Sequence, residues 1–361
     1  MQVLRLKINQ FRNLIDLDVE FSPRFNFIYG PNGSGKSSLL EAIYFLSLGR
    51  SFRSTLASRA IQYEASQFNL FSIIVGEGFT TTLGLEKSRQ GKTRIKIGNN
   101  LESIGALAKL LPMQFVNPNS YHLLSGGPRV RQQFIDWGVF HVEPNFFSVW
   151  QQFYKILKQR NAALQDQSLL NQVNVWNCKL VECAVQITQM REKYLQQLTP
   201  LITELIVKLL DLDKLKITFY QGWDKQLSLA HVLQQAFSRD VTLGYTQYGP
   251  HRADFLIKLR GNPVYEVLSR GEQKLLAYAL QLAQGLLLKK ITNKSCIYLF
   301  DDLFAELDTM KQAYLLSLLN KLDAQVFVTV IESGLIRSLN SPALGKKFQV
   351  KKGAVMEEKL E

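Results

Sequence analysis

The stretch from residue 25 to residue 46 constrains the fold more than any other, because it runs from an apolar strand through a glycine-rich turn into a helix. Phe25, Phe27 and Ile28 predict a buried strand ahead of the turn. The apolar residues behind the turn recur on one helical face: Leu39, Leu40, Ile43 and Leu46. This order of elements predicts an α/β protein.

The turn itself has the spacing Gly30-x-x-x-x-Gly35-Lys36-Ser37, which is the P-loop spacing. A triphosphate needs many hydrogen-bond donors at once, and Gly33 and Gly35 let the backbone turn its N–H groups inward at the positive end of a helix. Lys36 adds a charge for the β- and γ-phosphates, and the Ser37 hydroxyl suits Mg²⁺. The alternative, an accidental Gly/Ser surface loop, does not explain the flanking strand and helix. The predicted nucleotide-binding residues here are Gly30, Pro31, Asn32, Gly33, Ser34, Gly35, Lys36, Ser37 and Ser38.

Length and charge narrow the class of protein. A chain of 361 residues is expected to hold about two domains. No apolar run is long enough to span a bilayer, and the N-terminus alternates polar and apolar residues, so we expect a cytoplasmic protein without a membrane partner. Three scattered cysteines predict neither a zinc cluster nor disulfides. The net charge of +13 favours a polyanion such as nucleic acid as partner; a merely soluble basic protein is the alternative.

Strand and helix patterns alternate along the chain. The first 115 residues are expected to form strands around one helix, with a half-buried strand over 14–21 and a hairpin over 94–104. Helical periodicity dominates from about Arg129 to Leu210, where an aromatic stripe predicts core packing: Phe146, Val149, Trp150, Phe153 and Leu157. Strands return near 213–220, 254–259, 296–302 and 325–330, and the third predicts a parallel strand buried on both faces.

A second constellation begins at 268-LSRGE, where Ser269 and Gly271 open a helix and form a second anion-binding surface. A serine-capped helix with Glu272 near its third position explains this stretch locally. The order of motifs along the chain favours a nucleotide-binding role as well, because an apolar strand then ends in Asp301 and Asp302, as in an ABC-type ATPase. Asp301 is predicted to hold Mg²⁺ through water, and Asp302 to orient the attacking water. A Ca²⁺ or nuclease pair is the alternative for the two aspartates.

These motifs make the chain similar to the RecF family, the bacterial recombination-repair ATPases that belong to the SMC-like branch of ABC proteins. The resemblance extends nearly end to end, over 11-FRN-13, 30-GPNGSGKSSLLEAIYFLSLGRSFRS-54, 126-GGP-128, 157-LKQRNAAL-164, 249-GPHRADF-255, 268-LSRGEQKLLAYAL-280 and 300-FDDLFAELD-308. It implies an ATP-dependent homodimer that binds DNA, both as duplex and at single-strand/duplex junctions. This dimer would cooperate with RecR and RecO at gaps and promote RecA loading.

The resemblance also implies roles for particular residues. Arg12 and Asn13 would lie beside the nucleotide, with Gln114 as the Q-loop residue. Ser269 and Gly271 would meet the γ-phosphate bound by the partner subunit, and Asp308 would lie at the dimer seam. This sequence departs from the family pattern at Asn119, where many relatives have glutamate, at 131-RQQ-133, where arginines are fewer, and after 325–330, where no histidine follows.

We therefore expect an ABC-type P-loop ATPase lobe built from residues 1–115 and 243–361, with a mainly helical lobe, 116–242, inserted between its halves. The expected function is an ATP-gated DNA clamp with weak, DNA-stimulated ATPase activity, in which Lys36 and Asp302 act in catalysis. Two alternatives stay open: the ATPase subunit of a transporter, which needs an apolar coupling surface, and an SMC-like end-processing complex, which needs a metal-dependent nuclease partner.

Overall fold

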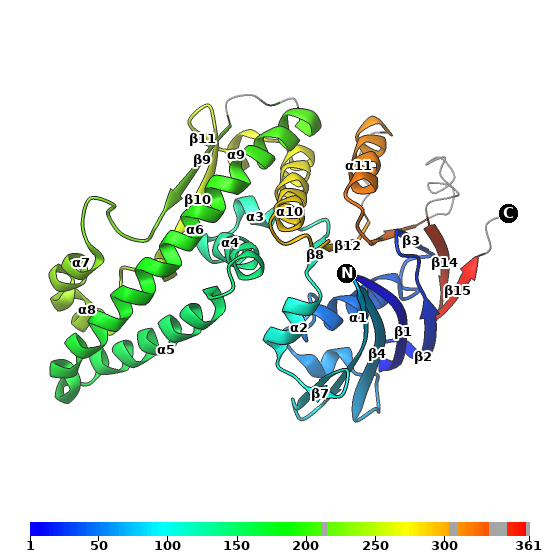
Figure 1. Cartoon of the computed structure of the whole chain (residues 1–361), viewed down its shortest axis with the longest axis horizontal. Helices are drawn as coiled ribbons and strands as arrows, with labels where there is room; N and C mark the ends of the chain where they lie inside the picture. Colours follow the sequence, from blue (N-terminus) through cyan, green and yellow to red (C-terminus); the bar gives the residue numbers. More distant parts are fainter. Residues whose placement is uncertain (211, 213–214, 303–308, 332–344, 359–361) are drawn as a thin grey trace. The chain divides into compact units, whose positions relative to one another are not determined.

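The computed structural model describes the chain except for residues 211, 213–214, 303–308, 332–344 and 359–361 (Figure 1). Packing divides it into two compact units, Met1–Ser120 with Leu288–Glu361, and Tyr121–Leu287. The sequence grouped residues 243–287 with the ATPase lobe. In the structure this segment packs inside the second unit, because it contributes β10 to the sheet of that unit and Gln284 Nε2 donates to Phe134 O at 2.7 Å. Its functional assignment to the ATPase lobe stays a prediction.

The first unit contains a six-stranded sheet with the order β15-β14-β3-β13-β12-β8. All neighbouring pairs are parallel except β14 with β15, so the carboxyl ends of β3, β12 and β13 lie at one edge. Each residue of β3, β12 and β13 is buried, as the sequence predicted for the strand before Asp301. The strands are β3 (Phe25–Tyr29), β8 (Met113–Val116), β12 (Ile297–Phe300), β13 (Val326–Val330), β14 (Gly345–Lys351) and β15 (Ala354–Glu358).

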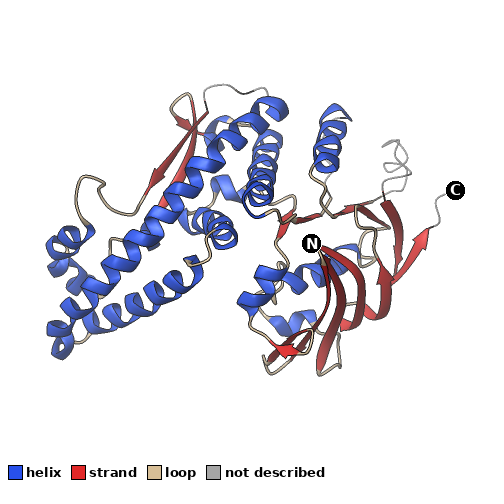
Figure 2. Cartoon of the chain, viewed as in Figure 1, coloured by secondary structure: helices blue, strands red, loops and turns tan. Residues whose placement is uncertain are grey.

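A second, antiparallel sheet of the same unit has the order β2-β1-β4-β5-β6-β7 (Figure 2). The core joins it to α1 (Lys36–Leu48) through edge-to-face contacts of Phe11, Phe45 and Phe68. The half-buried strand and the hairpin predicted from sequence are confirmed as β2 and as β6 with β7. The other elements are β1 (Gln2–Phe11), β2 (Leu14–Glu20), β4 (Gln67–Gly76), β5 (Phe79–Ser88), β6 (Thr93–Ile97), β7 (Asn100–Leu101), a 3-10 turn (Ala57–Ala60), α2 (Ile104–Leu110) and α11 (Thr309–Lys321).

The second unit is mainly helical, with a small sheet of order β11-β10-β9. The stripe on α5 is confirmed as core at Phe146, Phe153 and Leu157, which are buried, while Val149 and Trp150 are half-buried. Lys155 and Lys158 on the other face are exposed. Its elements are α3 (His122–Ser125), α4 (Pro128–Val142), α5 (Phe146–Gln165), α6 (Val173–Leu210), β9 (Leu215–Tyr220), α7 (Leu229–Gln235), α8 (Phe237–Leu243), β10 (Asp254–Leu259), β11 (Asn262–Pro263), α9 (Val264–Val267), α10 (Arg270–Thr292) and 3-10 turns at Gln167–Gln172 and Pro250–Arg252.

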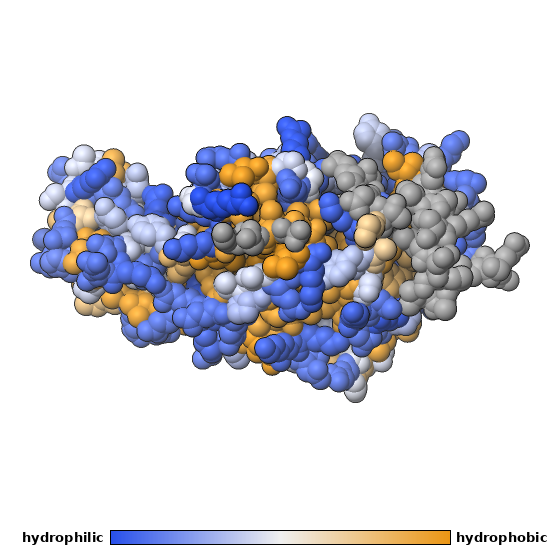
Figure 3. Space-filling view, turned by 90° about the horizontal axis from the view of Figure 1, so that it is seen from above, coloured by the Kyte–Doolittle hydropathy of each residue, from blue (hydrophilic) through white to orange (hydrophobic). Residues whose placement is uncertain are grey.

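Hydrophilic and hydrophobic side chains are mixed on the face seen in Figure 3. Within the described part of the chain, none of the helices has the length and apolar character needed to cross a membrane. The long helix α6 is amphipathic instead of apolar all round. Its buried residues recur at intervals of three and four, as on a helix that packs one face on a protein core.

Candidate nucleotide-binding site

The predicted phosphate cradle connects the end of β3 to the start of α1. Gly35 precedes the helix with φ 120°, and Gly30 has φ 151°, both in the region that favours glycine. A Cβ atom on Gly30 would lie 2.3 Å from the Val350 carbonyl oxygen, and one on Gly35 would lie 2.8 Å from Asn13 Nδ2. Gly30 therefore has no room for a side chain against the backbone, and Gly35 has a backbone angle that other residues rarely adopt.

Lys36 turns back into the cradle. Its Nζ donates to the Gly30 carbonyl at 2.6 Å and to the Pro31 carbonyl at 3.1 Å. Burial lowers the pKa of Lys36, and the charges of Asp302 and Asp301 oppose that change. Among the described residues, the direct partners of this ammonium are backbone oxygens of the loop, which leaves its positive charge to attract an anion in the cradle.

Ser34 in the same loop has a buried hydroxyl for which the described residues offer no hydrogen-bond partner. A buried polar atom without a partner is costly, so such atoms mark places where a ligand or water completes the structure. This hydroxyl, the lysine and the glycine backbone together form a donor set that fits the phosphates of a nucleotide.

The two aspartates follow directly after β12. Ser37 Oγ donates to Asp301 Oδ1 at 3.3 Å, so residues 264 positions apart in sequence meet at the carboxyl edge of the sheet. The backbone N–H of Asp301 donates to the Val116 carbonyl at 2.9 Å, which fixes the strand end against β8. In the described part of the chain no three His, Cys, Asp or Glu side chains gather as a metal cluster. A hydroxyl and one carboxylate suit Mg²⁺, which keeps water and phosphate oxygens as its other ligands.

Thr329 is a site residue that the sequence analysis missed. Its Oγ1 donates to Asp301 Oδ1 at 2.7 Å and accepts from the Asp302 backbone N–H at 2.9 Å. One hydroxyl therefore fixes both aspartates, and Asp302 has the unusual backbone angle φ 53°. The sequence signal was available: Thr329 is the polar residue within the apolar strand 326-VFVTV-330 and is fully buried.

Asp302 lies next to Asp301 and binds Thr329 through its backbone N–H, whereas Asp301 binds Thr329 through its carboxylate. Partial burial raises the pKa of the Asp302 carboxyl, the neighbouring Asp301 charge raises it further, and Lys36 opposes both. The two carboxylates thus differ in environment, since Asp301 accepts from Ser37 and Thr329. A carboxylate with a raised pKa is the better acceptor for a proton of a bound water.

Arg12 and Asn13 both lie next to the cradle, in different ways. Asn13 Nδ2 donates to the Ser34 carbonyl at 3.2 Å and so supports the loop. Arg12 forms a two-bond ion pair with Glu41 of α1, at 2.9 and 2.7 Å, and Glu41 also accepts from Ser51 at 2.5 Å. Glu41 is fully buried and is a second residue the sequence analysis missed. A nucleotide contact by Arg12 stays a prediction.

The remaining predicted residues fall elsewhere. Gln114 is buried in β8, in register with Tyr298 of β12. Ser269 and Gly271 belong to the second unit, where Ser269 and Glu272 form a capping box: Ser269 N and Oγ donate to Glu272 Oε2 at 2.8 and 2.7 Å, and Glu272 N donates to Ser269 Oγ at 3.3 Å. Asp308 lies outside the described residues.

A P-loop and an aspartate pair at the carboxyl edge of a parallel sheet define the class, an ABC-type ATPase fold. A solved Smc head bound to the C-winged helix domain of ScpA shares this fold with a TM-score of 0.62 at 16% identity, covering 100% of this chain and 98% of the other. The solved recombination mediator protein RecF-ATP in the RecFOR pathway is more similar, with a TM-score of 0.86, 27% identity, and coverage of 99% and 98%.

Sequence comparison agrees. The model of the RecF/RecN/SMC N terminal domain matches residues 2–353. The DNA replication and repair protein RecF of Psychromonas ingrahamii is 44% identical over 333 residues, which is 92% of this chain and 93% of that protein. RecF of Haemophilus influenzae is 42% identical over 356 residues, 98% of this chain and 99% of that protein. The chain belongs to the RecF family, within the proteins that carry this N-terminal domain.

Proposed function

We propose that the chain is an ATP-dependent DNA-binding protein of recombination and repair whose nucleotide acts as a switch. The hydrogen bond from Ser37 to Asp301 carries the proposal, because it joins the phosphate cradle to the aspartate pair as the reaction requires. Relatives that match nearly the whole chain are DNA replication and repair proteins, and a solved RecF contains ATP. The net charge of +13 supports a DNA partner.

Each residue of the cradle has a role in this proposal. Lys36 would exchange its bonds to the Gly30 and Pro31 carbonyls for phosphate oxygens, while Ser37 and Asp301 would hold Mg²⁺. Asp302 would accept a hydrogen bond from the attacking water. Bound MgATP supplies the γ-phosphoryl group and the charge that the cradle neutralises. Asp302 is shorter than glutamate, so slow turnover is expected, as suits a switch.

The dimer is the other half of the proposal. Ser269 and Gly271 of one subunit would face the nucleotide held by Lys36 of another, with Asp308 at the seam. The Ser269 hydroxyl then has to exchange Glu272 for a phosphate oxygen. ATP would close two copies on DNA at gaps, and hydrolysis, stimulated by DNA, would release it. Cooperation with RecR and RecO in loading RecA, in the cytoplasm, completes the proposed role.

The proposal is tested by sedimentation and DNA binding of the full chain with ATP and Mg²⁺, with ADP, and without nucleotide. Dimers and tight duplex binding are expected with ATP and Mg²⁺, and neither is expected with ADP or without nucleotide. A protein that neutralises about six phosphates should show a slope near −5 when the logarithm of duplex affinity is plotted against that of salt concentration. A monomer under all three conditions, or a flat salt dependence, would contradict the proposal.

A further inference from the structure

Inside the second unit, the stretch 157–164 is bound to the segment that leads into the stretch 249–255. Arg160 Nη1 donates to Asp240 Oδ2 at 2.9 Å and to Thr246 Oγ1 at 2.5 Å. Asn161 Oδ1 accepts from the Thr246 backbone N–H at 2.9 Å. The segment 246–254 is therefore bound to α5 at its beginning.

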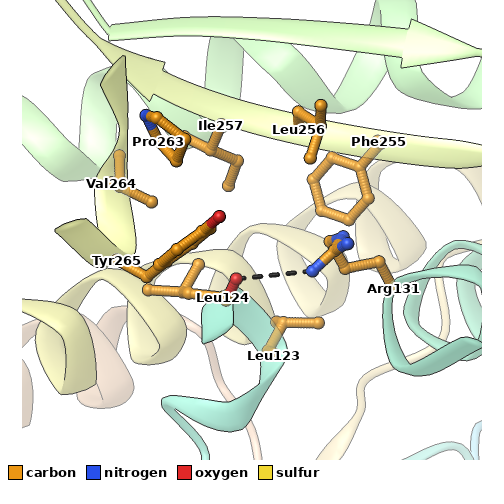
Figure 4. A pocket seen from close by; sticks show the side chains of 9 residues that line it. All are labelled: Leu123, Leu124, Arg131, Phe255, Leu256, Ile257, Pro263, Val264 and Tyr265. Carbon is orange, nitrogen blue, oxygen red and sulfur yellow. Dashed lines mark hydrogen bonds between the residues drawn. The ribbon is translucent and has the colours of Figure 1, made fainter. Parts of the chain in front are cut away.

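Two more arginines hold the rest of this segment. Arg191 donates to the Pro250 carbonyl at 2.6 Å while it pairs with Asp136, and Arg131 donates through Nε to Asp254 at 2.7 Å. Figure 4 shows Arg131 beneath β10, where its hydrogen bond to the Leu124 carbonyl closes the space; the cavity left there is about 10 Å³. Buried ion pairs contribute little net stability but require one geometry, so they point to a segment whose outer surface must be held rigid.

The rigid segment presents a cation to solvent, next to two exposed tyrosines outside the segment. Arg252 is exposed, lies 5.3 Å from the centroid of the Tyr245 ring, and pairs with no carboxylate among the described residues. Tyr245 is 40% exposed and Tyr220 is 48% exposed. Tyr220 is opposite Asp254 in the β9–β10 register, and Asp254 follows Arg252 by two positions. Tyr220, Tyr245 and Arg252 therefore belong to one surface.

The outer face of the β9–β10 pair continues this surface. Lys216 lies on the same face as Tyr220, and it is directly opposite Lys258. The other face of β10 is occupied by the core, through Phe255 and Ile257. Like charges directly opposite each other destabilise a strand pair, and among the described residues no carboxylate pairs with either lysine. A polyanion on this face would remove that repulsion.

We propose that this tyrosine–arginine surface, formed by Lys216, Tyr220, Tyr245, Arg252 and Lys258, binds a single strand of nucleic acid. The inference rests on the proposed function and deepens it by naming the form of DNA and its site. Exposed ring faces stack on unpaired bases, whereas a duplex hides its base faces in its own stack. The cations match the phosphates of the strand.

The surface also has a polarity. Asp224 and Tyr248 lie near Tyr220, and burial together with these two groups raises the pKa of the Tyr220 hydroxyl. A phosphate next to Asp224 would be repelled, while Arg252 would attract one. A base is therefore expected on the Tyr220 ring, with its neighbouring phosphate toward Arg252.

The test uses fluorescence anisotropy of the full chain, on a labelled oligodeoxythymidine of about 20 nucleotides without ATP, and on a duplex of the same length with ATP and Mg²⁺. Tyr220→Ala and Tyr245→Ala should each weaken single-strand binding by about five- to 150-fold, while duplex affinity stays within about twofold. Tyr220→Phe and Tyr245→Phe keep the ring and should bind like wild type. Arg252→Gln should reduce the salt slope on the single strand by about 0.7.

Tyr63→Ala is the matched control, since Tyr63 is 86% exposed and lies in the first unit. Unchanged single-strand binding by both alanine variants, an equal loss on duplex, or no binding of the oligonucleotide by wild type would each overturn the inference. If the surface instead binds a protein partner, both alanine variants should bind the single strand like wild type. Failure of the proposed function gives a different result: wild type then binds duplex with the same affinity with and without ATP.

Discussion

The two predicted halves of the ATP site differ in how far their hydrogen bonds are already satisfied. In the first unit, Ser34 Oγ is buried without a partner among the described residues, and Lys36 has only loop carbonyls. In the second unit, Ser269 and Glu272 satisfy each other in a capping box. The cradle is therefore prepared for a ligand in a single chain, whereas the helix start already satisfies its own hydrogen bonds and would have to open for the proposed partner subunit.

The largest effect is expected at the half that is prepared for ligand. Lys36→Ala removes a charge-assisted contact worth about 1.5–3 kcal/mol, so ATP affinity should fall by at least about tenfold and ATP-dependent dimers should disappear. Isothermal titration with ATP and Mg²⁺ measures this. Lys96→Ala, an exposed lysine of the same unit, serves as the control. Wild-type affinity in Lys36→Ala would mean that the cradle is not the nucleotide site.

The second effect separates the two halves. Ser269→Arg should leave ATP binding by the single chain unchanged but abolish ATP-dependent dimers, because a bulky side chain would occupy the seam while the cradle is untouched. Ser228→Arg is the matched control: Ser228 also caps a helix of the second unit, accepting from the His231 N–H at 3.3 Å. Both variants lose about 1 kcal/mol of cap stability. Sedimentation that finds dimers in Ser269→Arg would show that the sites are not shared between subunits.

The same contrast explains what could be predicted from sequence. The P-loop and the aspartate strand were identified because local spacing and burial patterns specify them, and the parallel register then brings Ser37 to Asp301. The capping box was weighed as the local explanation of Ser269 and is confirmed as its conformation in the single chain. For other contacts distant in sequence, the local pattern marks a polar residue in an apolar stretch but does not identify its partner.

Thr329 and Glu41 show why. Thr329 acts on aspartates 27 and 28 positions away, and Glu41 pairs with Arg12 29 positions away, so neither role follows from a local pattern. The buried arginines of the second unit are similar, since Arg160 meets Asp240 80 positions away. Each is a polar residue in an apolar pattern, and that is the signal a sequence offers for such contacts.

A third prediction tests whether the fixed aspartates matter beyond nucleotide binding. Thr329→Val keeps the shape of the side chain but removes its bonds to Asp301 and Asp302, so kcat for ATP hydrolysis should fall by about tenfold while KM stays within about twofold. Thr329→Ser should restore kcat. The control is Thr188→Val, because the buried Thr188 hydroxyl has no partner among the described residues. Equal losses in both valine variants would reduce Thr329 to a packing residue.

The smallest effect is expected in stability, at Asp302. The fold raises the pKa of this carboxyl above its ordinary value of 3.8, so the protonated form is favoured by folding and the charged form destabilises the first unit above the folded-state pKa. Asp302→Asn should therefore raise the free energy of unfolding at pH 7, by less than about 1 kcal/mol because the group is partly exposed to solvent, and Tm should rise slightly with it. The gain should shrink as the pH falls toward 3.8, where the wild-type carboxyl is protonated too. Asp16→Asn, at an exposed position of β2, is the control for the substitution itself. In the same variant the ATP-bound dimer should persist and hold DNA longer, since the group that orients water is gone while the cradle is intact. A lower Tm at pH 7 would mean that the Asp302 carboxylate stabilises the fold. A monomer with ATP bound would mean that this carboxylate is needed for the dimer.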